Sequence, residues 1–234
     1  MRVVVFGLLL FTLSAFAACK GEPSKEAASA PSAASSPAPA KPDKSVAKIV
    51  AFGDSLTAGY GLSPEDSYPS LLQKKLAADG FNYEVVNAGI SGDTSAGGVR
   101  RIDWSLEGDV KIVILELGAN DILRGQPIAE MKKNLSMIIA RAKAHGAKVL
   151  LAGMEAPTNS GSDYRRWTHG AFSDLAKEQN VALIPFLLDR VAGIQSLNQE
   201  DGIHPTPEGT RIVADTVYQY LKPMLEKTDQ AAAK

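Results

Sequence analysis

The stretch Val46-Ala47-Lys48-Ile49-Val50-Ala51-Phe52 is followed at once by Gly53-Asp54-Ser55 and then by Leu56-Thr57-Ala58-Gly59-Tyr60. The first seven residues have the length and the β-branched content of a buried strand. A strand that stops at a glycine leaves the next side chains at its carboxyl end, where open α/β sheets bind their ligands. We therefore expect Ser55 to lie at the functional edge of a sheet, near the start of a helical turn, in a suitable position for a nucleophile.

Gly53-Asp54-Ser55 is also ordinary turn chemistry, because all three residue types suit tight turns and helix caps. Taken alone, the three residues are more typical of a turn than of a catalytic site. The rest of the chain must decide between these interpretations.

Strands and amphipathic helices alternate after this first strand. Further strands are expected at residues 83–88, 111–117, 147–154 and 181–188, and helices at 68–78, 98–106, from Pro127 to a stop at Gly146, at 164–179 and from Pro207 onward. The run Ile112-Val113-Ile114-Leu115 is continuously hydrophobic, which is typical of a strand buried on both faces. Five strands alternating with helices predict one α/β domain over residues 46–228, with a parallel sheet covered on both sides and right-handed crossovers.

The charge balance excludes some classes of partner. The chain has 234 residues, with 25 Lys and Arg against 26 Asp and Glu and a formal net charge of −1. No basic surplus points to nucleic acid, and no acidic surplus points to a disordered solvating chain. The single cysteine, Cys19, excludes an internal disulfide framework.

The first 18 residues are predicted to be a signal peptide. Arg2 supplies a positive charge, and residues 3–18 carry none, a run that is short for a membrane span of about 20 residues. The end of the run, Ala17-Ala18-Cys19, resembles the lipobox of bacterial lipoproteins, although Phe16 stands where an aliphatic residue is usual. We expect Cys19 to be lipidated; the alternative is ordinary secretion after Ala18 with an incidental thiol.

Residues 19–45 are expected to form a disordered tether. Ala, Ser, Pro and Lys dominate residues 20–44, which contain no aromatic or large aliphatic residue, so this segment cannot bury enough surface to fold. Residues 229–234 are expected to form a disordered tail. These features predict a module on the periplasmic side of the cell envelope. Lys20 after the cysteine favours an outer-membrane lipoprotein, and without lipidation the protein would be periplasmic or secreted.

The segment Asp201-Gly202-Ile203-His204-Pro205 carries a second candidate for chemistry. A carboxylate bonded to one imidazole nitrogen fixes the tautomer and leaves the other nitrogen to accept a proton. A serine hydroxyl needs such a base to be a good nucleophile at neutral pH. A purely structural contact between Asp201 and His204 is the main alternative. A metal pair is disfavoured because two ligands are too few and no other ligand motif supplies the rest. We expect neither a metal nor a cofactor.

An acyl-transfer site also needs donors for the developing oxyanion. Gly89 or Gly92, after the second strand, could bring a backbone N–H close, and Asn120, after the third strand, could add its side-chain amide. Each also fits a plain turn or a helix cap. His145 and His169 are expected to be idle, the first at a helix end and the second on a helix surface.

Four blocks in order resemble the GDSL or SGNH hydrolase superfamily, and they cover nearly the whole domain. They are Gly53-Asp54-Ser55-Leu56, Ile90-Ser91-Gly92-Asp93-Thr94, Gly118-Ala119-Asn120-Asp121 and Asp201-Gly202-Ile203-His204-Pro205. The resemblance implies a three-layer α/β/α, flavodoxin-like sandwich with a five-stranded parallel sheet. It also implies that Ser55 is the nucleophile, His204 the base and Asp201 its orienter. Ser55, Gly92 and Asn120 would form the oxyanion hole, which selects Gly92 over Gly89.

The function implied by this resemblance is that of a serine esterase acting through an acyl-enzyme. The chain looks similar to the bacterial arylesterase and thioesterase I/lysophospholipase L1 group, so the expected substrates are small acyl esters or lysolipids and, as an extension, acyl thioesters. The expected partners are these substrates and a membrane, with no nucleic acid. The loop Glu155–Asp163, which lies where relatives carry a substrate loop, has a sequence particular to this chain. Two alternatives remain open: an envelope carbohydrate O-acetyl esterase, and a non-catalytic lipid- or partner-binding lipoprotein.

Overall fold

The computed structural model describes residues 46–157 and 160–232. In this part of the chain the strands are β1 (Ala47–Gly53), β2 (Tyr83–Gly89), β3 (Val110–Glu116), β4 (Lys148–Ala152) and β5 (Ala182–Ile184). The helices are α1 (Ser55–Ala58), α2 (Tyr68–Ala78), α3 (Ser95–Ser105), α4 (Ala119–Leu123), α5 (Ile128–Ala144), α6 (Ser162–Gln179) and α7 (Pro207–Ala232), with short 3-10 helices at Pro64–Asp66 and Gln195–Leu197. The predicted signal peptide, the predicted lipidation site at Cys19 and the predicted tether lie outside the described residues.

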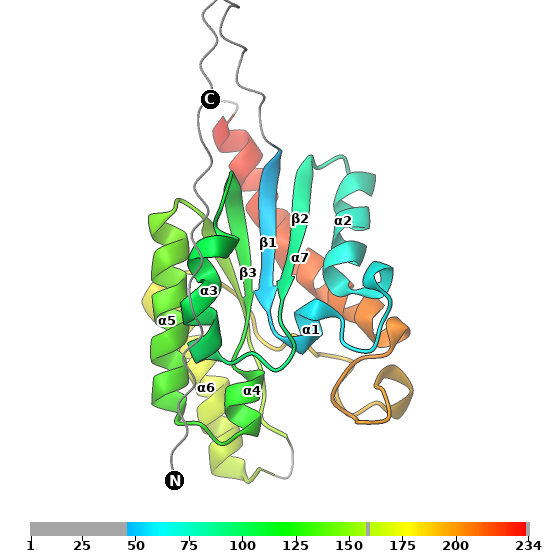
Figure 1. The fold of residues 1–234 in the computed structure, drawn as a ribbon, viewed down its shortest axis with the longest axis vertical. Helices are drawn as coiled ribbons and strands as arrows, with labels where there is room; N and C mark the ends of the chain where they lie inside the picture. Colours follow the sequence, from blue (N-terminus) through cyan, green and yellow to red (C-terminus); the bar gives the residue numbers. More distant parts are fainter. Residues whose placement is uncertain (1–45, 158–159, 233–234) are drawn as a thin grey trace, which may run out of the picture. The chain divides into compact units, whose positions relative to one another are not determined.

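The five strands form one parallel sheet in the order β2-β1-β3-β4-β5. Val50 of β1 pairs with Val86 of β2 on one side and with Val113 of β3 on the other. Helices cover both faces: α2 packs against α7 on one face, and α3, α5 and α6 pack side by side on the other. Figure 1 shows α3 on the near side of the sheet and α7 on the far side. The predicted α/β/α sandwich with a five-stranded parallel sheet is confirmed.

The two central strands, β1 and β3, are the most apolar segments of the domain. From Ile49 to Phe52 and from Ile112 to Leu115 every side chain is buried, because helices cover both faces of the sheet and leave no solvent-facing side. Burying one large aliphatic side chain contributes about 1.5–3 kcal/mol to the stability of the fold, so these strands form the centre of the core. The sheet is therefore a rigid base for whatever lies at its edges.

Several element boundaries differ from the prediction, each for a local reason. β5 was expected over residues 181–188 but ends at Ile184, because Pro185 has no N–H to donate to a ladder. α3 was expected from Gly98 but begins at Ser95, because the side chain of Thr94 caps it by accepting from the N–H of Gly97 at 3.3 Å.

The last helix also departs from the expected domain end at residue 228. α7 continues to Ala232, so residues 229–232 are helical rather than part of a disordered tail. No glycine or proline follows Pro223, and Gln and Ala are good helix formers. Residues 233–234 lie outside the described residues.

The topology places a crevice beside the ends of β1 and β3. The chain leaves β1 through α2 to reach β2 on one side, and then crosses back through α3 to β3 on the other side of β1. At such a switch point the connections diverge, and ligands bind outside the carboxyl ends of the strands. Figure 1 shows α1 and α4, which follow β1 and β3, at this same end of the sheet. Within the described residues no helix is long and apolar enough to cross a membrane.

Candidate active site

Ser55 is held at the end of β1 by a tight turn into a helix. Gly53 has no room for a side chain, because a Cβ there would collide with Thr57 and with the carboxylate of Glu116. Asp54 is the N-cap of α1, and its Oδ1 accepts from the N–H of Leu56 at 3.1 Å. The turn interpretation of Gly53-Asp54-Ser55 was thus correct for Asp54. The same turn presents Ser55 at the carboxyl end of β1.

The predicted nucleophile, base and acid lie in hydrogen-bond contact. His204 Nε2 is 2.8 Å from Ser55 Oγ, although 149 positions separate the two residues. His204 Nδ1 is 2.6 Å from Asp201 Oδ2. These distances are within hydrogen-bond reach, the first requirement for a nucleophile and its general base. The structure therefore brings Ser55, His204 and Asp201 together in the predicted order.

Hydrogen bonds determine the charge of Asp201. The imidazole of His204 and the backbone N–H groups of His204 and Ile203 donate to this carboxylate, and together they lower its pKa to about 2. An ionised carboxylate only accepts hydrogen bonds. Nδ1 of a neutral His204 must then carry the proton, which leaves Nε2 as an acceptor facing the hydroxyl of Ser55.

The loop that carries His204 is fixed by residues that the sequence did not single out. The backbone N–H of Gln199 donates to the carbonyl of His204 at 2.7 Å. The side-chain amide of Gln199 donates to the carbonyls of Tyr60 and Pro205 at 2.8 and 2.9 Å. The ring of Tyr60 lies 4.6 Å from the ring of His204, centroid to centroid. These contacts tie the His204 loop to the segment after α1.

The predicted oxyanion donors line the same pocket as Ser55 and His204. Gly92 has a φ of +79°, a conformation that glycine adopts without strain. In the described part of the chain, neither the N–H of Ser55 nor that of Gly92 donates to a protein acceptor. Asn120 is in the first turn of α4, and its Nδ2 donates to Asp54 Oδ2 at 2.9 Å. An amide carries two N–H bonds, so one of them remains for a substrate oxygen.

Two buried carboxyl groups lie beneath the nucleophile, and the sequence interpretation gave neither a role in the chemistry. Glu116 Oε2 accepts from the N–H of Asp54 at 3.0 Å and from the hydroxyl of Thr57 at 2.8 Å, and Glu116 is fully buried. Burial raises the pKa of Glu116 well above its ordinary range, and the nearby charge of Asp54 adds to this effect. Burial also raises the pKa of Asp54, but hydrogen bonds from Leu56 and Asn120 oppose it. We therefore place the proton on Glu116 and the charge on Asp54.

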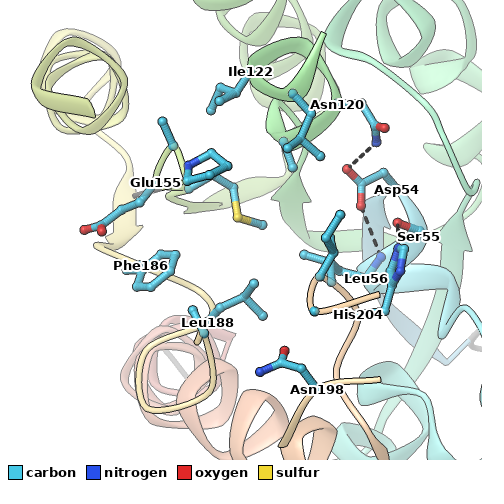
Figure 2. Close-up of a pocket in the computed structure, with 18 of the residues that line it drawn as sticks. Asp54, Ser55, Leu56, Asn120, Ile122, Glu155, Phe186, Leu188, Asn198 and His204 are labelled. Atoms are coloured by element: carbon cyan, nitrogen blue, oxygen red, sulfur yellow. Dashed lines mark hydrogen bonds between the residues drawn. The ribbon is translucent and has the colours of Figure 1, made fainter. Parts of the chain in front are cut away.

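A cavity of about 980 Å³ opens beside these residues. Figure 2 shows Ser55 and His204 on one side of it, with Ile122, Phe186 and Leu188 around the rest. Glu155 lies at the far end, and its carboxylate points away from the catalytic side chains. The lining is largely apolar between the catalytic groups and Glu155, which suits a ligand that is mostly hydrocarbon.

The other two histidines lie outside this site. His145 is the C-cap of α5, and its Nε2 is 3.5 Å from the carbonyl of Gly108. His169 is exposed on α6, with Nδ1 3.4 Å from Glu155 Oε1. Across residues 46–157 and 160–232 no group of three or more His, Cys, Asp or Glu side chains is arranged to hold a metal ion.

A serine in contact with an imidazole that is held by a carboxylate, beside an apolar pocket, defines a serine hydrolase that acts on acyl groups. The sequence model of the GDSL-like Lipase/Acylhydrolase family matches residues 51–212. The chain belongs to this family, and it is a serine carboxylic ester hydrolase.

Relatives of the chain are named as esterases and thioesterases. The chain is 42% identical to Esterase TesA of Pseudomonas aeruginosa over 178 residues, which cover 76% of this chain and 89% of the relative. It is 39% identical to an arylesterase of Vibrio mimicus over 175 residues, covering 74% and 88% of the two chains. It is 36% identical to Thioesterase 1/protease 1/lysophospholipase L1 of Escherichia coli K12, covering 76% and 84%.

Solved structures show the same fold. The crystal structure of TesA superposes with a TM-score of 0.74 at 42% identity, covering 75% of this chain and 98% of TesA. The psychrotrophic esterase EstA from Pseudoalteromonas sp., inhibited by monoethylphosphonate, superposes with a TM-score of 0.73 at 35% identity, covering 76% and 98%. The predicted family, fold class and enzyme class are confirmed.

Proposed function

We propose that this enzyme hydrolyses acyl esters through an acyl-enzyme on Ser55, with His204 as general base and acid and Asp201 as the group that orients His204. The single observation that carries the proposal is the contact of 2.8 Å between Ser55 Oγ and His204 Nε2. Apo enzymes often hold such contacts more loosely than this. A contact this short indicates a preorganised nucleophile.

The first half of the reaction transfers the acyl group to the enzyme. Ser55 Oγ attacks the ester carbonyl carbon while its proton passes to His204 Nε2. The resulting imidazolium is stabilised by the ionised Asp201, which keeps the proton on Nδ1 in place. Collapse of the tetrahedral intermediate breaks the bond to the leaving alcohol, and that alcohol takes the proton from His204.

The oxyanion is the charge that the site must stabilise. The backbone N–H groups of Ser55 and Gly92 and the second N–H of Asn120 are its proposed donors. Removing one such donor typically costs about 10²–10³-fold in turnover. In the second half of the reaction a water gives its proton to His204 and attacks the acyl carbon, and the same three donors serve again. The bond from that carbon to Ser55 Oγ then breaks, Ser55 Oγ takes the proton from His204, and the carboxylic acid leaves.

The pocket favours an acyl chain of several carbons over an acetyl group. Its volume of about 980 Å³ is far larger than an acetyl group fills. An apolar chain would contact Ile122, Phe186 and Leu188, and each buried methylene contributes about 0.8 kcal/mol. We infer that the preferred substrates are aryl or lysolipid esters of such acids, and thioesters with the same acyl group react at the same carbonyl.

The test uses Ser55→Ala with an aryl ester of a medium-chain acid. The variant should fold with an unchanged far-UV spectrum and lose turnover, and mass spectrometry of quenched wild-type enzyme should find the acyl group on Ser55. Substantial turnover by Ser55→Ala would refute the assignment. A panel that varies acyl length then separates the alternatives: release of acetate from acetylated sugar with no cleavage of longer chains would favour the O-acetyl esterase.

We also propose that the enzyme is a lipoprotein of the cell envelope, anchored through Cys19 and facing the periplasm. This proposal rests on the apolar run 3–18 and the sequence Ala17-Ala18-Cys19. One acyl chain gives only marginal membrane binding, so stable anchoring requires several. Cys19→Ser should move the full chain from the membrane fraction to the soluble fraction. An enzyme that is soluble before the substitution would exclude the anchor.

A further inference from the structure

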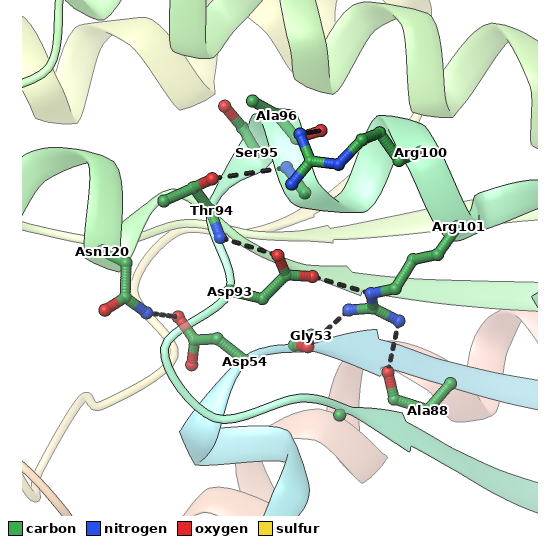
Figure 3. A network of polar contacts seen from close by, with 12 residues as sticks. Gly53, Asp54, Ala88, Asp93, Thr94, Ser95, Ala96, Arg100, Arg101 and Asn120 are labelled. Atoms are coloured by element: carbon green, nitrogen blue, oxygen red, sulfur yellow. Dashed lines mark hydrogen bonds and ion pairs between the residues drawn. The ribbon is translucent and has the colours of Figure 1, made fainter. Parts of the chain in front are cut away.

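Arg101 of α3 reaches across the ends of β1 and β2. Its Nε contacts Asp93 Oδ2 at 2.7 Å, and its two terminal nitrogens donate to the carbonyls of Ala88 and Gly53, each at 2.8 Å. Figure 3 shows this guanidinium between Asp93 and the two strand ends. The guanidinium also lies over the ring of Phe52, 3.9 Å from its centroid. All three nitrogens of the group are therefore used.

This cation is largely withdrawn from water, yet it does not touch the substrate pocket. The side chains of Arg101 and Asp93 are 16% and 12% exposed, and neither residue lines the cavity that contains Ser55. Nearly buried ion pairs contribute little net stability when their desolvation is counted. Because this pair lies one loop away from the reacting atoms, we examine whether it holds parts of the active site in place.

One of the three hydrogen bonds of Arg101 ends at the carbonyl of Gly53. This carbonyl also accepts from the N–H of Ile90 at 3.0 Å, and the N–H of Asp93 donates to the carbonyl of Ile90 at 3.0 Å. Ser91 and Gly92 lie between Ile90 and Asp93. The loop is thus attached to Gly53 directly at its first residue, and through the Asp93–Arg101 pair at its last.

Gly53 is also the residue from which the Ser55 turn starts. The proposed donors Ser55 N–H and Gly92 N–H belong to two different segments, and Arg101 is bonded to both segments at once. We infer that Arg101, paired with Asp93, is a positioning residue that fixes the separation of these two oxyanion donors; this inference rests on the acyl-enzyme mechanism proposed above.

The planar fork of arginine suits this position in a way that lysine does not. A guanidinium directs several N–H bonds in fixed directions, whereas an ammonium is a single compact charge. Lysine at position 101 would keep the charge and satisfy only some of Asp93, Ala88 and Gly53. Asp93→Asn would instead keep the shape of the side chain and remove the negative charge that Arg101 pairs with.

The experiment measures steady-state kinetics of Arg101→Lys and Asp93→Asn in the full chain. Arg100→Gln is the matched control, because Arg100 lies beside Arg101 on α3 but is exposed, and among the described residues its side chain bonds to the carbonyl of Ala96 in its own helix alone. A displacement of catalytic groups of the order of 1 Å costs up to about 10²-fold in rate. We expect kcat to fall about 10- to 100-fold in both variants, with KM within about twofold of wild type, and Arg100→Gln to be unchanged.

A second readout observes the oxyanion hole itself. A phosphonate that reacts with Ser55 leaves a phosphoryl oxygen where the oxyanion would lie, so the ³¹P resonance of the adduct reports the hydrogen bonds to that oxygen. In Arg101→Lys and Asp93→Asn this resonance should move away from the wild-type position. In Arg100→Gln it should coincide with wild type.

The outcomes separate this inference from the proposed function. If wild type fails to label at Ser55, the acyl-enzyme mechanism is wrong. If wild type labels, but the folded variants keep both kcat and the wild-type resonance, Arg101 does not position the donors. If the variants melt at a lower temperature but keep the wild-type kcat, the inference is also overturned, because the Asp93–Arg101 pair would then contribute to stability alone. If Arg101→Lys does not fold, Asp93→Asn decides by the same measurements.

Discussion

Asp201 keeps its charge because three donors converge on it. Hydrogen bonds from the His204 imidazole and from two backbone N–H groups lower its pKa to about 2, so the acid is ionised at neutral pH. Because this pKa is depressed, protonation of Asp201 causes a loss of activity only as the pH falls towards about 2. Any acid limb found at higher pH belongs to another group.

The corresponding prediction concerns Asp201→Asn. An amide can either accept a hydrogen bond from His204 Nδ1 or donate one to it, so it no longer fixes the tautomer of His204. We expect kcat to fall about 10³- to 10⁴-fold. The measurement is kcat with an aryl ester, together with KM, which should change little. Asp189→Asn, an exposed acid on a neighbouring loop, is the control. A loss in Asp201→Asn of less than tenfold would contradict the proposed role.

Glu116 is a residue at which pH controls stability. Its pKa is raised in the folded state by burial, from an ordinary value of 4.5. Above this value the unfolded chain loses the proton while the folded chain keeps it, so the folded state binds more protons and stability falls as pH rises. The decline ends once the pH passes the folded-state pKa.

We therefore predict that Glu116→Gln becomes progressively more stable than wild type as the pH rises. The difference in unfolding free energy should grow by at most about 1.4 kcal/mol per pH unit. Urea denaturation between about pH 5 and about pH 9 measures it. The exposed Glu107→Gln should give a curve parallel to wild type. A parallel curve for Glu116→Gln would show that Glu116 is ionised in the folded protein.

At the scale of elements, the base and the nucleophile are carried by separate segments that Gln199 connects. Its side-chain amide bonds to the carbonyl of Tyr60, after α1, and to that of Pro205, beside His204. Gln199→Ala removes both bonds, each with a net contribution of about 1 kcal/mol. We predict that kcat falls about five- to tenfold while KM stays constant. Gln195→Ala, in the exposed turn nearby, is the control; equal kinetics for the two variants would exclude this connection.

The strands were predictable because burial on both faces leaves a continuous apolar run, as in β1 and β3. The gathering of Ser55, Gly92 and Asn120 was also predicted, since strand ends of a parallel sheet converge on one edge. The approach of Asp201 and His204 was expected from the family resemblance, because no strand ends close before them. The contact of Asp54 with Asn120 and the contacts of Arg101 were not. An Asp in a turn has local partners available, and nothing in its neighbours shows that one carboxylate oxygen bonds to a residue 66 positions away.

At the scale of the whole molecule, the sheet separates the start of the domain from its chemistry. The chain enters β1 at Ala47, at the amino end of the strands, whereas Ser55 and the ends of β2 and β3 lie at the carboxyl end. The seven residues of β1 span about 23 Å at 3.3 Å each. The buried core also begins within β1, at Ile49. Every residue that the described part of the chain places in the site follows the start of β1.

We therefore predict that a chain starting at residue 46 retains the catalysis of the full chain. With a short-chain water-soluble aryl ester, kcat and KM should lie within about twofold of the full-length enzyme, since no group that contacts the transition state has been removed. The unfolding free energy should also be unchanged, because the predicted tether has no aromatic or large aliphatic residue in positions 20–44 with which to bury apolar surface. Ser55→Ala in the shortened chain gives the background rate. A large fall in kcat after truncation would mean that residues 1–45 contribute to the site itself, and a rise in KM confined to lipid-dispersed substrates would instead assign them to localisation.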